Sequence, residues 1–231
     1  MFSRSIQGLL DALPSQCMVC RAWPSQSICE ACVNRFAQPR TRCQTCALVV
    51  PAGVRQCGEC IRNPPPLDSC LAAVSYDFPW INLILGYKFH QQPGRASAFA
   101  LLLRSTPWVE PALDAASLLL PVPLSRARLQ TRGYNQALLL ARQLAPGKAE
   151  HRLLLRIRDT APQSSLKRAQ RLDSLRHVFA VDPLLHQRVR GARLVLVDDV
   201  MTSGATLYAA AHALRAAGAA HITALVIART E

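Results

Sequence analysis

Eight of the nine cysteines in this chain form four Cys-x-x-Cys pairs between residues 17 and 60. Each pair can place two thiolates at neighbouring positions of a tetrahedral zinc ion, with Zn–S distances of about 2.3 Å. The surrounding region has little hydrophobic periodicity, so bound metal must supply much of its folding energy. The sequence therefore predicts a small N-terminal Cys-rich zinc-binding domain with two structural Zn²⁺ sites. The expected ligands are Cys17, Cys20, Cys29, Cys32, Cys43, Cys46, Cys57 and Cys60.

The order of the pairs leaves the assignment of ligands to ions open. Connections of eight and ten residues favour two sequential sites, at 17–32 and 43–60, and interleaved pairing is the alternative. An iron–sulfur cluster is a second alternative to zinc. The ninth cysteine, Cys70, is expected to pack as a small hydrophobic residue.

The N-terminal residues do not resemble a secretory signal. Their apolar side chains, between Phe2 and Leu13, are spaced like one face of a short helix and form no continuous run. No apolar run in the sequence reaches the roughly 18 residues that a membrane-spanning helix needs. We therefore expect a cytoplasmic protein without membrane insertion, in which disulfides are rare.

The composition changes near residue 63, where Asn63 and three prolines favour a stiff, extended connector. We therefore expect two domains, 1–66 and 67–231. Beyond the connector, the pattern predicts strands at 71–76, 117–124, 193–200 and 221–228, and helices at 80–89, 96–104, 134–145 and 204–218, while 152–157 fits either. Alternation of this kind predicts an α/β fold with an open, mostly parallel sheet flanked by helices.

A short apolar strand followed by acids, small hydroxyl residues and a helix lies near the end of the chain. The run Leu194–Val197 ends in Asp198 and Asp199, and Thr202, Ser203, Gly204 and Thr206 precede the helix. Amides at a helix N-terminus bind phosphate, and adjacent carboxylates can accept hydrogen bonds from ribose hydroxyls. The motif therefore predicts a ribose-phosphate pocket at the carboxyl end of a sheet strand, with a simple helix cap as the alternative.

The positive charge of the chain is concentrated in its middle. The formal net charge is +13, and residues 121–193 contain 15 Lys and Arg against 4 Asp and Glu. Such a surface attracts polyanions, either nucleic acid or phosphorylated metabolites. A solvated basic loop is the alternative interpretation for Arg126 and Arg128.

The segment VLVDDVMTSGAT, residues 195–206, resembles the phosphoribosyl diphosphate (PRPP) signature of type I phosphoribosyltransferases. Nearly the whole chain resembles one branch, the ComF family, which includes competence protein ComF and GntX-like proteins. The further matching features are the cysteine pairs, Lys88-Phe89, PVPL…RxxxRGYNQA at 121–137 and PQSSL…R at 162–171. Family members usually have Asn where this chain has Ser174. The resemblance implies a type I phosphoribosyltransferase fold with an N-terminal double zinc ribbon.

The resemblance also implies roles for individual residues. Asp198 and Asp199 would be the catalytic residues and would hold the ribose hydroxyls of PRPP. The 5-phosphate would be bound by Thr202, Ser203, Gly204, Ala205 and Thr206. The diphosphate side would be formed by Arg132, Gly133, Tyr134, Asn135 and Gln136. Mg²⁺ would accompany PRPP and neutralise the leaving diphosphate.

The function that the resemblance implies is that of a PRPP-binding phosphoribosyltransferase, a glycosyltransferase-class enzyme whose acceptor the sequence does not identify. It also implies a part in competence, natural transformation and DNA uptake, with single-stranded DNA and proteins of DNA uptake or recombination as partners. The basic middle segment gives an independent reason to expect DNA binding. The alternatives are a non-catalytic nucleic-acid-binding module and a PRPP-sensing regulator that retains the fold.

Overall fold

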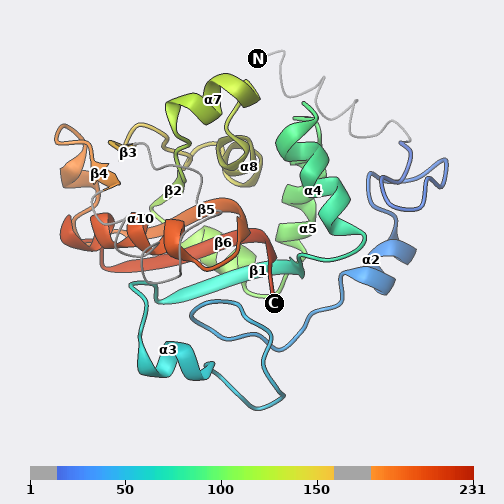
Figure 1. Ribbon diagram of the computed structural model, residues 1–231, viewed down its shortest axis with the longest axis horizontal. Coiled ribbons are helices and arrows are strands. Elements are labelled where there is room, and N and C mark those ends of the chain that lie inside the picture. Colours follow the sequence, from blue (N-terminus) through green and yellow to red (C-terminus); the bar gives the residue numbers. More distant parts are fainter. Residues whose placement is uncertain (1–14, 159–177) are drawn as a thin grey trace. The chain divides into compact units, whose positions relative to one another are not determined.

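The structure is a computed structural model that describes residues 15–158 and 178–231 (Figure 1). Contacts divide the chain into two compact units, Met1–Gln38 and Pro39–Glu231. The apolar residues between Phe2 and Leu13 and the family segment 162–171 lie outside the described ranges. Among the helices that are described, none is long and apolar enough to cross a membrane.

The described part of the first unit is small and holds the first two cysteine pairs. Ser15 and Ser25 form an antiparallel bridge, and helix α2 (Glu30–Phe36) follows the second pair. Cys29 is the N-cap of this helix and Cys32 lies in its first turn. The local backbone therefore positions the second pair of thiols at one helix terminus.

The second unit is built on a four-stranded sheet in which every pair of neighbouring strands is parallel. The strands are β1 (Ser69–Ser75), β2 (Leu118–Pro121), β5 (Arg193–Met201) and β6 (His221–Arg229), in the order β1-β6-β5-β2. A separate antiparallel pair is formed by β3 (Leu154–Arg156) and β4 (Phe179–Val181). Residues 152–157, which fitted either element by periodicity, therefore contain a strand. The predicted α/β class with a parallel sheet is confirmed.

Helices lie on both sides of the sheet (Figure 1). The helices of the second unit are α3 (Gly58–Arg62), α4 (Trp80–Phe89), α5 (Arg95–Arg104), α6 (Val109–Ala115), α7 (Arg126–Arg132), α8 (Gln136–Leu144) and α10 (Ala205–Ala216), with a 3₁₀ turn at His186–Arg188. Leu194 and Leu196 pack in one core cluster with Leu207 and Leu214 of α10. Because side chains alternate along a strand, the residues between them face α5 and α8, which contact the sheet on its other side.

The second two cysteine pairs belong to the same hydrophobic core as the sheet. Cys43, Cys46, Cys57 and Cys60 are buried in one cluster with Ala72 and with the strand and helix residues just described. The backbone of this segment also joins the sheet, because the Cys70 amide donates to the Gln44 carbonyl at 2.8 Å. Residues 39–66 are thus part of the compact unit that contains the sheet.

The arginine-rich segment after β2 is helix α7, so in the alternative interpretation of Arg126 and Arg128 the loop was wrong, while both residues are exposed. The hydroxyl of Ser125 caps the helix by accepting from the Arg128 amide at 3.3 Å, and Gly133 ends it with φ of +77°. None of its residues is buried, so the segment has no hydrophobic periodicity that could reveal a helix.

Candidate functional site

The predicted acid pair lies near the carboxyl end of the central strand β5. Asp199 is buried, and Asp198 is partly accessible. Each carboxylate accepts a hydrogen bond from the next amide, Asp198 from Asp199 at 2.8 Å and Asp199 from Val200 at 2.6 Å. These local bonds fix both side chains at the edge of the sheet where parallel strands end. Open α/β sheets commonly bind their ligands at this edge.

A lysine from another element neutralises part of this charge. The ammonium of Lys88, in the last turn of α4, lies 2.8 Å from Asp199 Oδ1. Both side chains are mostly buried, so the pair is screened much less than a surface ion pair. Helix α4 therefore contributes a cation directly to the acid pair.

The pKa of Asp198 is shifted by its surroundings. Burial, followed by the negative charge of Asp199, raises the pKa of Asp198 from its ordinary value of 3.8 to about 7, although Lys88 opposes the shift. Arg132 also acts on the pair, because its charge lowers the pKa of Asp198 while Asp199 counteracts the lowering of the Arg132 pKa by burial. A carboxyl group that titrates near neutrality can accept or release a proton when a ligand binds.

The loop after β5 has the geometry of a phosphate cradle. Gly204 has φ of +79° and is the N-cap of the twelve-residue helix α10. A Cβ atom at Gly204 would lie 2.5 Å from Met201 Cε and from Tyr208 Cζ, so glycine is required by both backbone and packing. The N-cap residue Gly204 provides no side-chain cap, the Ala205 amide makes only a long hydrogen bond to Ser203 Oγ at 3.4 Å, and Thr202 is exposed. The helix start can therefore offer amide groups to an anion.

The predicted diphosphate segment contributes a cation and a glycine to the same site. Arg132 ends α7, donates from Nη1 to Gln136 Oε1 at 3.3 Å, and has its Cζ atom 4.8 Å from the centre of the Phe89 ring. Gly133 follows in the left-handed conformation, and a Cβ atom there would have nothing within 4 Å. Backbone at Gly133 is thus open to close approach.

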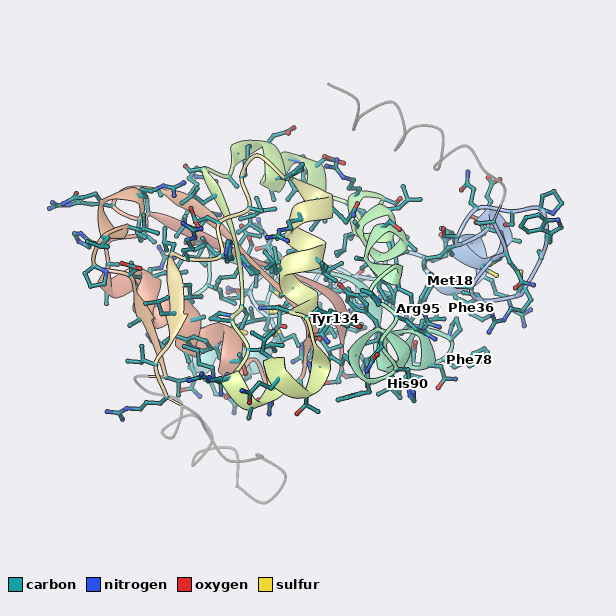
Figure 2. The ribbon with its side chains drawn as sticks, turned by 90° about the horizontal axis from the view of Figure 1, so that it is seen from above. Met18, Phe36, Phe78, His90, Arg95 and Tyr134 are labelled. Atoms are coloured by element: carbon teal, nitrogen blue, oxygen red, sulfur yellow. The ribbon has the colours of Figure 1, made fainter. Side chains whose placement is uncertain are left out.

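The other three residues of this segment form scaffold contacts. The Tyr134 hydroxyl donates to the Tyr87 carbonyl, and the two rings are 6.0 Å apart (Tyr134 is labelled in Figure 2). Asn135 caps α8 by accepting from the Leu138 amide at 3.2 Å. Gln136 is buried and donates to the Lys88 carbonyl at 3.3 Å. These contacts hold α4 against α8, and a direct contact of these three side chains with a ligand stays a prediction.

Two residues that contact the candidate site have no sequence signal of their own. Lys88 looks like an ordinary C-terminal helix lysine, and only its place in the family resemblance marked it. Arg229 ends the apolar strand β6 but is 9% exposed, and its guanidinium donates to carbonyl groups of Cys46 and Thr202. A buried arginine of this kind is visible only when distant segments are brought together.

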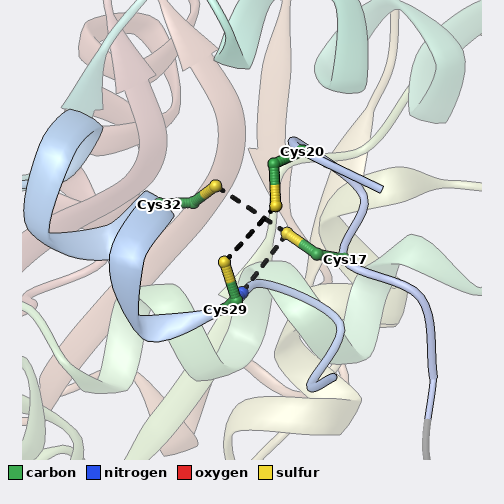
Figure 3. Close-up of side chains that lie close together, drawn as sticks. All are labelled: Cys17, Cys20, Cys29 and Cys32. Atoms are coloured by element: carbon green, nitrogen blue, oxygen red, sulfur yellow. Dashed lines mark hydrogen bonds between the residues drawn. The ribbon is translucent and has the colours of Figure 1, made fainter. Parts of the chain in front are cut away.

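The first cysteine group can hold a tetrahedral metal ion (Figure 3). The sulfurs of Cys17 and Cys32 are 3.9 Å apart, and those of Cys20 and Cys29 are 3.6 Å apart. Four sulfurs at about 2.3 Å from zinc would be separated by about 3.8 Å. Burial alone would raise the pKa of Cys17, but hydrogen bonds from nearby amides, including that of Cys29, lower it to about 6. The thiolate form is therefore favoured at Cys17, whereas burial and the neighbouring thiols raise the pKa of Cys32.

The second cysteine group has the same arrangement inside the sheet unit. The four sulfurs of Cys43, Cys46, Cys57 and Cys60 lie within 4.8 Å of one another, and the Cys46–Cys57 separation is 3.7 Å. The sulfurs thus assemble in sequential and not interleaved order. All nine cysteines are free of disulfides, and Cys70 is buried beside this group as expected.

Comparison with known proteins gives relatives along almost the whole chain. Residues 130–231 match the family described as phosphoribosyl transferase domain. DNA utilization protein YhgH of Salmonella typhimurium is 32% identical over 94% of this chain and 98% of its own length. Competence protein F of Haemophilus influenzae is 28% identical over 93% and 96%, and competence protein ComFC of Bacillus subtilis is 28% identical over 90% and 86%.

The two cysteine groups predict different effects on stability. Replacing Cys57 and Cys60 by Ser should leave one metal ion per chain and destabilise the sheet unit by several kcal/mol, because that group lies in its core. Replacing Cys29 and Cys32 by Ser should also remove one ion but leave the sheet unit intact. Metal analysis counts the bound ions. Hydrogen exchange of the β5 amides, together with thermal unfolding, measures the stability of the sheet unit. Equal destabilisation of β5 by the two variants would contradict this assignment.

The raised pKa of Asp198 predicts a pH-dependent stability. The folded chain keeps a proton on Asp198 between pH 4 and 7 that the unfolded chain releases, so this stability is present at low pH and is lost as the pH rises through about 7. Asp198→Asn removes the effect. The free energy of unfolding of the variant, taken relative to that of the parent, should therefore rise by on the order of 2 kcal/mol from pH 5 to pH 8. Urea unfolding at both pH values measures the gain, and a constant difference would contradict the raised pKa.

Proposed function

Since the chain belongs to the ComF family, we propose that it binds PRPP at the acid pair and the loop after β5. The observation that carries the proposal is the placement of Asp198 and Asp199, with Asp199 paired to Lys88, a few residues before a helix N-terminus that begins at a glycine. Ribose hydroxyls next to a phosphate would satisfy the carboxylates and the amides at once. This combination is the one that a phosphoribosyl group offers.

The roles of the residues follow from their positions. Asp198 and Asp199 accept hydrogen bonds from the two ribose hydroxyls and lie beside the positive charge that develops on the sugar when diphosphate leaves. Residues 202–206 bind the 5-phosphate through hydroxyl groups and main-chain amides. Arg132 and the open backbone of Gly133 receive the diphosphate. Mg²⁺ bound with PRPP would neutralise further diphosphate charge.

Phosphoribosyl transfer to an acceptor is the reaction that this site would support. The C1–oxygen bond to diphosphate breaks, the diphosphate carries the bonding electrons away, and a nucleophile of the acceptor forms the new bond to C1. Lys88 keeps one carboxylate in place and compensates its charge, so the pocket can close on the sugar without leaving two unpaired buried anions. The cysteine groups, as zinc sites, would be structural.

The acid pair gives the direct test of PRPP binding. Asp198→Asn combined with Asp199→Asn should lower PRPP affinity by at least about a hundredfold, because two charge-assisted hydrogen bonds to the ribose are weakened. Asp114→Asn, at an exposed position in α6, is the matched control and should bind like the parent. Calorimetry with PRPP and Mg²⁺ measures the affinities. Undiminished PRPP affinity in the double variant would refute the site assignment.

Single-stranded DNA is the second proposed ligand, and the surface of α7 favours it. Arg126 and Arg128 are exposed on a helix with no buried residue, and Phe89 is 58% exposed with Arg132 stacked on its ring. Basic side chains bind the sugar-phosphate backbone, and an exposed aromatic ring can stack on a base. Together with the names of the relatives, this surface supports a part in DNA uptake and utilisation.

The salt dependence of DNA binding tests this surface. Replacing Arg126, Arg128 and Arg132 by Ala should weaken binding of an oligo-dT strand and reduce the slope of log K against log salt by about 2, since fewer counterions are released. Arg142→Ala, at an exposed position in α8, is the control and should change the slope by less than one. Fluorescence anisotropy at several salt concentrations gives the slopes. An unchanged slope in the triple variant would place the DNA surface elsewhere.

A further inference from the structure

A single buried guanidinium joins the second cysteine group to the phosphate loop. Arg229 is at the end of β6, and its Nε donates to the Cys46 carbonyl at 2.9 Å. Its Nη1 donates to the Thr202 carbonyl at 2.6 Å and to the Met201 carbonyl at 3.3 Å. Cys46 is one of the four clustered thiols, and Met201 and Thr202 begin the loop.

A second set of contacts connects the same two places. The Cys70 amide donates to the carbonyl of Gln44, which lies between the first two thiols of the group. The Cys70 thiol lies 3.5 Å from the Met201 sulfur. The end of the Met201 side chain fills the space beneath Gly204, where the loop turns into α10. Movement of the cysteine segment would therefore displace the loop through these packing contacts as well as through Arg229.

We propose that Arg229 is a positioning residue of the phosphate loop, and that a metal ion at Cys43, Cys46, Cys57 and Cys60 sets the anion affinity of the loop through it. The proposal rests on the proposed function only for the identity of the anion, PRPP. The position of the loop itself is a property of the chain without ligand. The Cys17–Cys32 group, in the other compact unit, has no such role.

The chemistry of arginine makes this coupling direct. The guanidinium is planar and rigid, so the direction of Nη1 is fixed once Nε is bonded to Cys46. A buried cation that loses a carbonyl acceptor is destabilised by its unsatisfied desolvation, so a conformation in which it binds another acceptor becomes favourable. A dication with four thiolates is also net negative, which favours a neighbouring cation. Loss of the metal would release the Cys46 carbonyl, turn Arg229 and leave the Thr202 carbonyl without its donor.

A loop that is not held in place binds its anion less well. Phosphate binding by main-chain amides depends on several N–H groups converging before the ligand arrives, because ordering them afterwards costs conformational entropy. Carbonyl groups fixed at Met201 and Thr202 determine where the following amides point. Arg229 thus acts on the ligand through the loop and does not itself need to touch it.

Hydrogen exchange of the ligand-free metal-loaded protein tests the loop directly. The amides of Tyr208 and Thr230 report on the loop, because they donate to the carbonyls of Gly204 and Met201. In Arg229→Gln these two amides should exchange about tenfold faster, while those of Leu140 and Leu144 in α8 keep the parent rates. Arg229→Lys should show the same acceleration, because one ammonium cannot hold the fork geometry. Parent-like exchange of Tyr208 and Thr230 in both variants overturns the proposal. If Arg229→Gln accelerates exchange in α8 as well, Arg229→Lys decides: acceleration confined to Tyr208 and Thr230 supports the proposal, and acceleration in α8 too overturns it.

The role of the metal ion is tested by chelation in a variant that lacks the first cysteine group. In the Cys29→Ser, Cys32→Ser variant only the second site remains, and its metal can be withdrawn by a chelator while exchange is followed. Loss of protection at the Tyr208 and Thr230 amides before loss of protection in α8 supports the coupling, and simultaneous loss overturns it. With metal present, this variant should bind PRPP like the parent, whereas Arg229→Gln should bind it about tenfold more weakly.

The two proposals fail in different ways. If the parent shows no PRPP binding in calorimetry, the proposed function fails, while the exchange experiment still decides whether Arg229 and the metal hold the loop. If the parent binds PRPP and Arg229→Gln binds it with equal affinity and keeps two metal ions, the coupling fails and the PRPP site stands.

Discussion

The need to compensate two adjacent carboxylates inside the protein organises most of the sheet unit. Asp198 and Asp199 lie on the central strand, where burial makes charge expensive. Lys88 reaches them from α4, and Arg132 approaches from the end of α7. Gln136 bonds to both cations, accepting from Arg132 and donating to the Lys88 carbonyl, and Tyr134 adds a bond to the Tyr87 carbonyl of α4. The residues around the acids are therefore explained by electrostatics first and by ligand binding second.

The cysteine groups show that one motif can serve two structural roles. Four thiols in the first unit are gathered around a bridge and a short helix, where a metal would replace a missing hydrophobic core. Four thiols in the second unit are themselves part of a hydrophobic core that includes Leu194 and Ala72. The same Cys-x-x-Cys spacing thus stabilises a small unit in one place and supports a face of the sheet in the other.

Sequence periodicity was sufficient for the four strands of the sheet and for helices α4, α5, α8 and α10, but it missed the short helix α6 and strand β4. Strand β5 with its two acids, and helix α10 after it, follow from hydrophobic runs, two aspartates and a glycine. Helix α7 was missed because it buries nothing, and the contact of Lys88 with Asp199 was missed because it joins residues that are distant in sequence. Arg229 illustrates the same limit, since its partners Cys46 and Thr202 lie in segments that only the fold brings together. Local sequence pattern predicts the secondary structure of a segment, whereas the contacts of its side chains with distant segments become visible only in the fold.

Electrostatics also constrains how one domain could serve both PRPP and DNA. The backbone of a DNA strand is a polyanion with no free vicinal hydroxyls, so it gains little from the acid pair and is repelled by it. In the proposed site, PRPP would present those hydroxyls to the carboxylates and its phosphates to amides and arginine. A strand is therefore better accommodated along α7, where Arg126 and Arg128 are exposed and Phe89 offers a stacking surface. Arg132, at the end of α7 and close enough to the acid pair to interact with its charge, is the residue at which the two proposed ligands would meet.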